Sequence, residues 1–309
     1  MNWSAKLDVD EIDLAGADVA VVVGPTASGK SDLAITLAEA RDGEIIGADS
    51  VQVYRRFDIG SGKPSKVDRG RVAHHLIDVA DPLEPWDAAR YAARATEAIE
   101  DIRRRGKFPI VCGGTFLWVR ALLYGLSIAP TADPVIRRRH ATLAQEEGRA
   151  ALHAQLAAVD PDAALRLDPN DFVRVSRALE VFELSGRPLS LLQKEHGFRE
   201  PRYQARFIGV GWTAEELVAR IAKRTAHLLA AGFVEEVIEL SKLGYRDARA
   251  MASVGYKQVL DCVEGRLAHD ELAPAINRAT KVFARRQRTW LREQPVLWLD
   301  RREWSLPAV

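Results

Sequence analysis

Cysteine is scarce in this sequence of 309 residues, and its two copies, Cys112 and Cys262, lie far apart along the chain. Such spacing argues against a disulfide framework and against a cysteine-based zinc site. No run of apolar residues reaches the roughly 20 that cross a bilayer as a helix. The stretch before Asp18 carries acidic residues and no hydrophobic run, unlike a signal peptide. We therefore expect a cytoplasmic protein without a membrane partner.

A large charge of one sign is also absent, since the formal net charge is +1. Only the distribution of charge along the chain is therefore informative about partners. With 47% apolar and 28% charged residues, the composition is that of an ordinary globular protein. A chain of 309 residues is long enough for one large core or two smaller ones.

A phosphate-binding loop stands near the N-terminus, between a strand pattern and a helix pattern. Five apolar residues at 19–23 lead into a G-x-x-x-x-G-K-S motif, and helical periodicity begins directly after it. Its members, all candidate diphosphate ligands, are Gly24, Pro25, Thr26, Ala27, Ser28, Gly29, Lys30 and Ser31. Backbone amides of such a loop converge on an anion, the lysine adds a positive charge, and the Ser31 hydroxyl can hold Mg²⁺. The motif indicates a diphosphate but not the group attached to it.

Strand and helix patterns alternate through the first 130 residues. Strands are expected at 44–46, 72–79 and 108–112, with a helix from the Asp87 cap to about Arg105 and another at 116–124. This alternation predicts an α/β fold, with a P-loop NTPase-like parallel sheet flanked by helices on both faces. Asp49 follows the second strand, at the sheet edge where such folds bind ligands.

The pattern changes near Pro130. Residues 134–196 have helical periodicity and almost no strand signal, which predicts a helical insertion domain. Residues 205–210 read as a strand, Thr213 opens a capping box for a helix ending near Gly232, and 296–299 read as a last strand. We therefore expect a P-loop catalytic core at 1–130, a helical insertion at 131–200, and a return to the core with C-terminal helices at 201–309.

A basic stripe is predicted near the C-terminus, where residues 277–292 contain six cations and no acid. At helical spacing, five of the cations fall within roughly 80° of one another, opposite an expected packing face. The stripe comprises Arg278, Lys281, Arg285, Arg288 and Arg292, and the expected packing face comprises Ile276, Ala279, Phe283 and Trp290. Like charges at this spacing repel, so the stripe either binds a polyphosphate such as RNA or pairs with acids elsewhere in the fold.

Several motifs in fixed order give this chain a wider resemblance. They are GPTASGKS (24–31), ADSVQVYRRFDIGSGKP (48–64), HHLIDVADP (74–82), IVCGGTFLWVRALLYG (110–125), DPNDFVRVSRALEV (168–181), RIAKR (220–224), SVGYKQ (253–258) and ARRQRTWLR (284–292). Together they resemble the tRNA dimethylallyltransferase (tRNA isopentenyltransferase) family over nearly the whole chain. The chain departs from the family pattern at Phe116-Leu117-Trp118, which follows Gly-Gly-Thr, and at Ala279-Thr280-Lys281.

The resemblance implies transfer of a dimethylallyl group from dimethylallyl diphosphate to N6 of adenosine 37 in the tRNA anticodon loop. Lys30, Mg²⁺ at Ser31 and Arg224 would stabilise the leaving diphosphate, with Arg220 as the nearest competitor for the arginine's role. Asp49 is the candidate base for the N6 proton, although a carboxylate at this position can instead order the following loop. By resemblance, Thr115 contacts the adenine or the reacting groups.

The partners implied are dimethylallyl diphosphate and the anticodon stem-loop of tRNA, bound by a monomer. By resemblance, the helical insertion at 131–200 binds the tRNA. Residues assigned to the RNA by resemblance, or by the basic stripe, lie in four parts of the chain. They are Asp49, Ser50, Val51, Gln52 and Thr115; Arg137, Asn170, Arg174 and Arg177; Ser253, Gly255, Tyr256 and Lys257; and Arg278, Arg285 and Arg288.

Three other functions are compatible with parts of this pattern. A P-loop small-molecule kinase would hold ATP in the loop and use Asp49 as base for a hydroxyl. An adenylate isopentenyltransferase would act on a free nucleotide, but it would need neither the basic stripe nor the helical insertion. An RNA-binding module with an inactive loop is disfavoured by the intact Lys30, Ser31 and Asp49.

The adjacent His74 and His75 could suggest a metal site. They lack a third ligand at helical spacing and are interpreted as structural.

Overall fold

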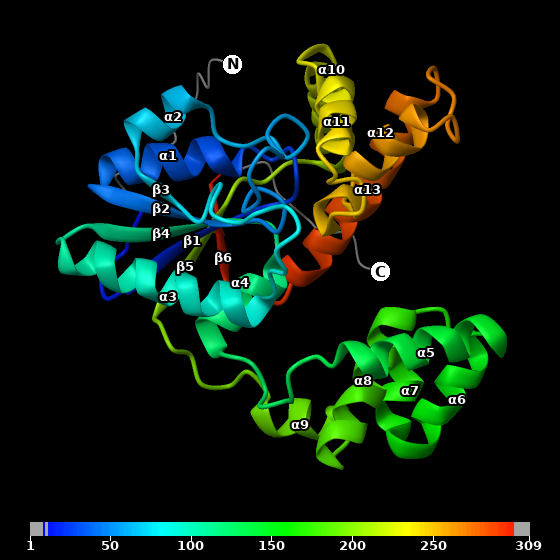
Figure 1. Ribbon diagram of the computed structural model, residues 1–309. Coiled ribbons are helices and arrows are strands. Elements are labelled where there is room, and N and C mark those ends of the chain that lie inside the picture. The colour runs from blue at the N-terminus through cyan, green and yellow to red at the C-terminus, as the bar shows by residue number, and fades with distance from the viewer. Residues whose placement is uncertain (1–8, 10–11, 300–309) are drawn as a thin grey trace. The chain divides into compact units, whose positions relative to one another are not determined.

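A six-stranded parallel sheet forms the centre of the larger of two compact units in a computed structural model that describes residue 9 and residues 12–299 (Figure 1). The strand order is β3-β2-β4-β1-β5-β6. The strands are β1 (Val19–Val23), β2 (Gly43–Ala48), β3 (His74–His75), β4 (Phe108–Gly113), β5 (Ala205–Gly209) and β6 (Val296–Trp298). Each neighbouring pair is parallel, so the predicted α/β class is confirmed.

Helices cover both faces of this sheet, as all-parallel sheets require. Figure 1 shows α1 (Lys30–Ala40) and α2 (Lys66–Arg71) on one side of the strands and α3 (Ala88–Arg104) and α4 (Phe116–Tyr124) on the other. All five residues of β1 are buried, which accounts for the unbroken apolar run in its sequence. As predicted, Asp87 caps α3 by accepting a hydrogen bond from the Arg90 amide.

Helices also follow β5. They are α10 (Ala214–Ala230), α11 (Phe233–Lys242), the short 3₁₀ helix η2 (Arg249–Ala252), α12 (Tyr256–Val263) and α13 (Leu272–Leu291). The capping box predicted at Thr213 is present, because its hydroxyl accepts from the Glu216 amide and the Glu216 carboxylate accepts from the Thr213 amide. No helix among the described residues is long and apolar enough to span a membrane.

Residues Tyr124–Pro201 form a separate compact unit made of helices alone. These helices are α5 (Pro134–Glu146), α6 (Arg149–Val159), α7 (Pro161–Arg166), α8 (Phe172–Ser185) and α9 (Leu189–His196). Asp133, Asp160 and Asp171 cap three of them, and Pro134 and Pro161 open two at positions where the missing amide costs nothing. Residues such as Leu152, Leu156 and Val175 pack into a core belonging to this unit.

The strand predicted at 72–79 is wrong beyond His75. Leu76 and Asp78 adopt left-handed backbone conformations, with φ of 59° and 58°, which end the pairing with β2. His74 Nδ1 lies 2.8 Å from the Val72 carbonyl oxygen, and His75 Nε2 lies 2.7 Å from a Glu44 carboxylate oxygen. Both rings thus have partners within the fold, which supports the structural interpretation of this pair.

The packing face predicted for the C-terminal helix is only partly correct. Ile276 is buried, but Phe283 is 38% exposed. The face that packs on the protein is rotated around α13 and comprises Leu272, Ile276, Thr280, Ala284, Gln287 and Leu291. Trp290 stacks on Phe116 with ring centroids 4.2 Å apart. Two polar residues outside the predicted packing face, Thr280 and Gln287, therefore lie on the face that packs on the protein.

Candidate active site

The phosphate-binding loop turns sharply between β1 and α1. Gly29 has φ of 90°, in the left-handed region that glycine adopts without strain. A Cβ on Gly24 would lie 2.5 Å from the Ser28 hydroxyl oxygen, so no larger residue fits there. These two positions explain why the motif needs glycine at both ends of the loop.

Side chains from distant segments bind the backbone of this loop. Trp212 Nε1 donates to the Ser28 carbonyl at 2.7 Å, and Arg220 Nε donates to the Ala27 carbonyl at 2.8 Å. The Arg220 guanidinium also lies 4.1 Å above the Trp212 ring. Arg220 therefore supports the loop as well as lining the cavity described next.

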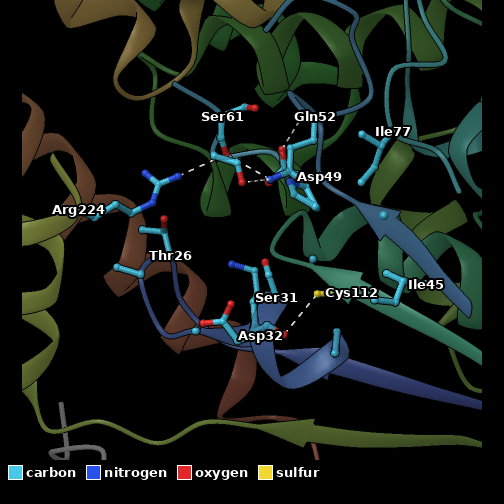
Figure 2. Close-up of a pocket in the computed structure, with 18 of the residues that line it drawn as sticks. Thr26, Ser31, Asp32, Ile45, Asp49, Gln52, Ser61, Ile77, Cys112 and Arg224 are labelled. Atoms are coloured by element: carbon cyan, nitrogen blue, oxygen red, sulfur yellow. Dashed lines mark hydrogen bonds between the residues drawn. The ribbon is translucent and has the colours of Figure 1, made fainter. Parts of the chain in front are cut away.

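A cavity of about 620 Å³ opens in front of this loop. Figure 2 shows its wall of side chains from the loop, the end of β2, the segment after β2, and α10. The lining residues are Thr26, Ala27, Gly29, Lys30, Ser31, Asp32, Ala34, Ile45, Gly47, Asp49, Gln52, Ser61, Gly62, Pro64, His74, Ile77, Cys112, Gly113, Ala219, Arg220, Lys223, Arg224 and His227. The cavity thus brings Lys30, Asp49 and Arg224 together from segments far apart in sequence.

Among the charged residues that line the cavity, Lys30 and Arg224 both interact electrostatically with the Asp49 carboxylate. Burial lowers the pKa of Lys30 and of Arg224, because little water remains to solvate either charge. The Asp49 carboxylate raises both pKa values but does not cancel the effect of burial. An anion bound between the two cations would replace their lost solvation, so the cavity favours a negatively charged ligand.

Asp49 orders the turn after β2 and also lines the cavity. Its Oδ1 accepts from the Val51 amide at 2.8 Å and from the Gln52 amide at 3.2 Å, so the carboxylate orders the following turn. It also lines the cavity, and Figure 2 shows it on the side facing the phosphate-binding loop. No hydrogen bond to Oδ2 occurs among the described residues, so one oxygen is available to accept a proton from a ligand.

Thr115 connects the ends of two neighbouring strands. Its amide donates to the Ala48 carbonyl at the end of β2, and its Oγ1 accepts from the Ser50 amide at 3.0 Å. The Thr115 hydroxyl lies 3.3 Å from the Ser50 hydroxyl. Thr115 is thus beside the Asp49 turn but not among the residues lining the cavity.

One wall of the cavity is apolar, with Ala34, Ile45, Ile77 and Cys112 facing the same space as the phosphate-binding loop. Burial raises the pKa of the Cys112 thiol to about 11, so the thiol stays neutral and acts as a small apolar group. The cavity can therefore hold a ligand with one anionic end and one short apolar end.

The sequence analysis gave no role to Gln287 of α13. Its Oε1 accepts from the Thr26 amide at 2.8 Å, and its Nε2 donates to the Gly114 carbonyl at 3.0 Å. The side chain is 4% exposed. Gln287 therefore joins the phosphate-binding loop to the turn after β4.

Comparison with known proteins gives consistent matches over most of the chain. A family described as IPP transferase matches residues 52–294, and one described as isopentenyl transferase matches residues 17–77. A protein named tRNA dimethylallyltransferase from Sorangium cellulosum is 60% identical over 92% of this chain and 91% of its own length. The chain belongs to the tRNA dimethylallyltransferase family.

Solved structures of relatives extend this agreement to the fold. A full-length tRNA isopentenylpyrophosphate transferase from Bacillus halodurans is 34% identical, with a TM-score of 0.67 over 91% of this chain and 88% of that one. A eukaryotic dimethylallyltransferase acting on tRNA is 28% identical, with a TM-score of 0.74 over 88% of this chain and 69% of that one. The P-loop NTPase-like architecture expected from the sequence is therefore that of the tRNA dimethylallyltransferase family.

Some family-derived RNA residues have side chains already engaged within the protein. Tyr256 is 1% exposed, and its hydroxyl donates to Glu236 Oε1 at 2.6 Å. Its side chain therefore has a partner within the protein and almost no accessible surface, and the assignment of Tyr256 to the RNA stays a prediction. In the helical unit, Arg137 and Arg177 both pair with the fully buried Glu180 carboxylate, at 2.9 and 2.5 Å. Both guanidiniums thus have a structural role there.

The remaining RNA candidates outside α13 differ in exposure, and Gly255 is buried. Asn170 and Lys257 are exposed, and Arg174 has a 73% exposed side chain beside Asp171. Ser253 and Gly255 form the turn that precedes α12, with the Gly255 amide donating to Gln258 Oε1.

The basic stripe is not uniform. Lys281 and Arg285 are exposed, whereas Arg278 lies 3.3 Å from the Glu271 carboxylate and Arg288 is partly buried. Burial lowers the pKa of Arg288, and the nearby Arg292 adds to this effect. Arg288 is therefore the least accessible cation of the stripe, whose other members are all exposed.

Proposed function

We propose that this chain transfers a dimethylallyl group from dimethylallyl diphosphate to N6 of adenosine 37 in the tRNA anticodon loop. The observation that carries the proposal is one cavity holding Lys30, Arg224 and Asp49 beside an apolar wall. The donor has the matching chemistry, an anionic diphosphate joined to a short apolar chain. The names of the 60% and 48% identical relatives, tRNA dimethylallyltransferase, support the same reaction.

The diphosphate is expected in the phosphate-binding loop, where backbone amides of residues 24–31 meet the first turn of α1. Lys30 and Arg224 then stabilise the negative charge that develops on the diphosphate as its bond to C1 breaks. Arg220 assists by holding the Ala27 carbonyl, which keeps the loop in its binding conformation. The apolar wall at Ile45, Ile77 and Cys112 would receive the dimethylallyl chain.

The acceptor nitrogen needs a base, because the N6 lone pair of adenine is delocalised into the ring. As the N6–C1 bond forms, the proton on N6 moves to the Asp49 carboxylate and the diphosphate leaves. The Val51 and Gln52 amides hold Oδ1, so Oδ2 is the oxygen proposed to take the proton. Thr115 and Ser50, beside this turn, are proposed to contact the adenine.

Magnesium fits the oxygen donors at the start of α1, where Ser31 and Asp32 both line the cavity. No group of three or more His, Cys, Asp or Glu side chains that could hold a metal occurs among the described residues. This agrees with Mg²⁺, which takes few protein ligands and completes its shell with phosphate oxygens and water. We propose that Ser31 and Asp32 hold it together with the donor diphosphate. Bound there, Mg²⁺ would neutralise charge on the leaving group.

The RNA is proposed to bind through residues near Asp49 and through solvent-facing cations elsewhere. Exposed candidates are Asn170 and Arg174 in the helical unit, Lys257 on α12, and Arg278, Lys281 and Arg285 on α13. The target base has to leave its stack to reach the cavity, as in other enzymes that modify bases. The cytoplasmic location and the monomeric state remain predictions.

A label-transfer assay tests this function against its alternatives. Dimethylallyl diphosphate labelled in the alkyl group, incubated with unmodified tRNA and Mg²⁺, is expected to label the RNA. ATP labelled in the γ-phosphate should label neither tRNA nor a small hydroxyl compound, which excludes the kinase. AMP offered in place of tRNA should accept no label, which excludes the adenylate isopentenyltransferase.

A further inference from the structure

The segment at 57–62 directs two side chains of the cavity. The Ser61 carbonyl accepts from Gln52 Nε2 at 3.2 Å and from Arg224 Nη2 at 3.3 Å, and the Gly62 carbonyl accepts from Gln52 Nε2 at 3.1 Å. Figure 2 shows Gln52, Ser61 and Arg224 grouped at one end of the cavity. The direction of the Arg224 guanidinium therefore depends on where this segment holds the Ser61 carbonyl.

The segment forms neither helix nor strand, and its amides are bound by one carboxylate and one phenol. Glu236 of α11 accepts from the amides of Asp58, Ile59 and Gly60 at 3.0, 2.6 and 3.1 Å. The next amide, that of Ser61, donates to the Tyr256 hydroxyl at 3.2 Å. Tyr256 in turn donates to Glu236 Oε1 at 2.6 Å. Hydrogen bonds to an ionised carboxylate are stronger than those between neutral groups, so Glu236 is the main anchor.

Close packing against side chains restricts the backbone conformation of this segment. A Cβ on Gly60 would lie 2.0 Å from the Phe233 ring and 2.7 Å from the Tyr256 ring, so the backbone rests directly on both. A Cβ on Gly62 would lie 2.4 Å from Arg224 Nη2. Burial and the Glu236 carboxylate raise the pKa of Tyr256, which keeps its hydroxyl protonated and able to donate. The contacts form a continuous path from Glu236 to Arg224.

We propose that Glu236 is a positioning residue for the donor diphosphate, acting through the 58–61 backbone on Arg224. This inference rests on the proposed function, since Arg224 is taken there as a diphosphate ligand. Glu236 is not among the residues that line the cavity, so its effect on the ligand is indirect. Both carboxylate oxygens of Glu236 accept hydrogen bonds, from backbone amides and from the Tyr256 hydroxyl. A glutamine has only one acceptor oxygen, and its NH2 group would face donors that it cannot bind. Glu236→Gln should therefore weaken the attachment of the 58–61 backbone.

The test measures the affinity of the purified full chain for inorganic diphosphate with Mg²⁺, by calorimetry. Glu236→Gln is expected to weaken binding about tenfold or more, as for loss of bonds to a charged group. Glu235→Gln is the matched control, because Glu235 is the exposed neighbour on the same helix and should bind as wild type. Tyr256→Phe, which keeps the buried ring, is expected to cause a smaller loss.

A double-mutant cycle separates positioning from a merely structural role. If Glu236 acts through Arg224, then Glu236→Gln should cause little further loss of affinity when combined with Arg224→Gln. Additive losses, or wild-type affinity in both Glu236→Gln and Tyr256→Phe, would overturn the inference. If Glu236→Gln fails to fold, the cycle is run with Tyr256→Phe and decides the question in the same way. Failure of wild-type protein to modify tRNA would instead count against the proposed function, because diphosphate binding is measured without RNA.

Discussion

Gln287 and Thr26, 261 residues apart in sequence, are joined by a 2.8 Å hydrogen bond between the Thr26 amide and the Gln287 side chain. The same side chain donates to the Gly114 carbonyl, so one buried amide satisfies backbone groups of two loops. A helix near the C-terminus thereby helps to set the conformation of the phosphate-binding loop. The contact also gives a physical reason for a glutamine on the packing face of α13.

We predict that Gln287→Leu lowers both stability and diphosphate affinity. The leucine leaves the Thr26 amide and the Gly114 carbonyl without partners, which costs about 1–3 kcal/mol of unfolding free energy. Urea unfolding with and without diphosphate measures both effects. Gln193→Leu, at an exposed position on α9, serves as control. Wild-type stability and affinity in Gln287→Leu would show that the hydrogen bonds contribute nothing.

We predict that Lys30→Met abolishes diphosphate binding without lowering the melting temperature. Burial lowers the pKa of Lys30 in the folded chain. Between the lowered folded pKa and the ordinary unfolded pKa, the unfolded chain binds more protons. Stability therefore rises with pH in that window, and below it the buried charge costs folding free energy. Replacing the lysine with an apolar side chain removes this cost.

Calorimetry for diphosphate and thermal unfolding near neutral pH check both halves of the Lys30 prediction. Lys66→Met, at an exposed position of α2, is the control for loss of one charge and should bind as wild type. Retained diphosphate affinity in Lys30→Met would contradict the assignment of the loop. A marked fall in melting temperature would contradict the electrostatic argument.

We predict that Asp49→Asn lowers the single-turnover rate by about two to four orders of magnitude, the usual effect of removing a positioned base. Affinity for tRNA should change little, because the asparagine oxygen can still accept from the Val51 and Gln52 amides. Asp81→Asn is a suitable control, since Asp81 also accepts a loop amide, from Leu83, but lies outside the cavity. Near wild-type transfer by Asp49→Asn would restrict Asp49 to ordering its turn.

The basic stripe gives a prediction about salt. Lys281→Gln with Arg285→Gln should make the slope of log K for tRNA against log salt shallower by about one and a half to two units. Both positions are exposed and suit this test, whereas Arg278 lies beside Glu271 and Arg288 is partly buried. Arg94→Gln with Arg104→Gln, two arginines of α3 with 56% and 73% exposed side chains, controls for the loss of two charges. An unchanged slope with a lowered melting temperature would identify the stripe as a structural ion network.

Features coded by neighbouring residues were predictable from the sequence. The phosphate-binding loop, the Asp87 cap and the Thr213 capping box each depend on a few consecutive residues, and all are present. The strand at 72–79 was predicted too long because apolar content does not reveal the left-handed turns at Leu76 and Asp78. Local pattern therefore gave the elements but not every boundary.

Contacts between distant segments were not predictable in the same way. Glu236 lies 176 to 178 residues from the amides it binds, and its position in a helix is typical of a solvated carboxylate. Gln287 disrupts the apolar periodicity of α13 because its partners are backbone groups of two loops. Tyr256 and Arg137 were assigned to RNA by resemblance, but burial and the Glu180 carboxylate give both a structural role.

The central claim is tested most directly by mass spectrometry of nucleosides from tRNA incubated with the wild-type protein, dimethylallyl diphosphate and Mg²⁺. Two transcripts are compared, one with adenosine at position 37 and one with guanosine there. The account predicts adenosine carrying one added C5H8 group in the first transcript and none in the second. Unmodified adenosine in the first transcript, or equal modification of both, would contradict it.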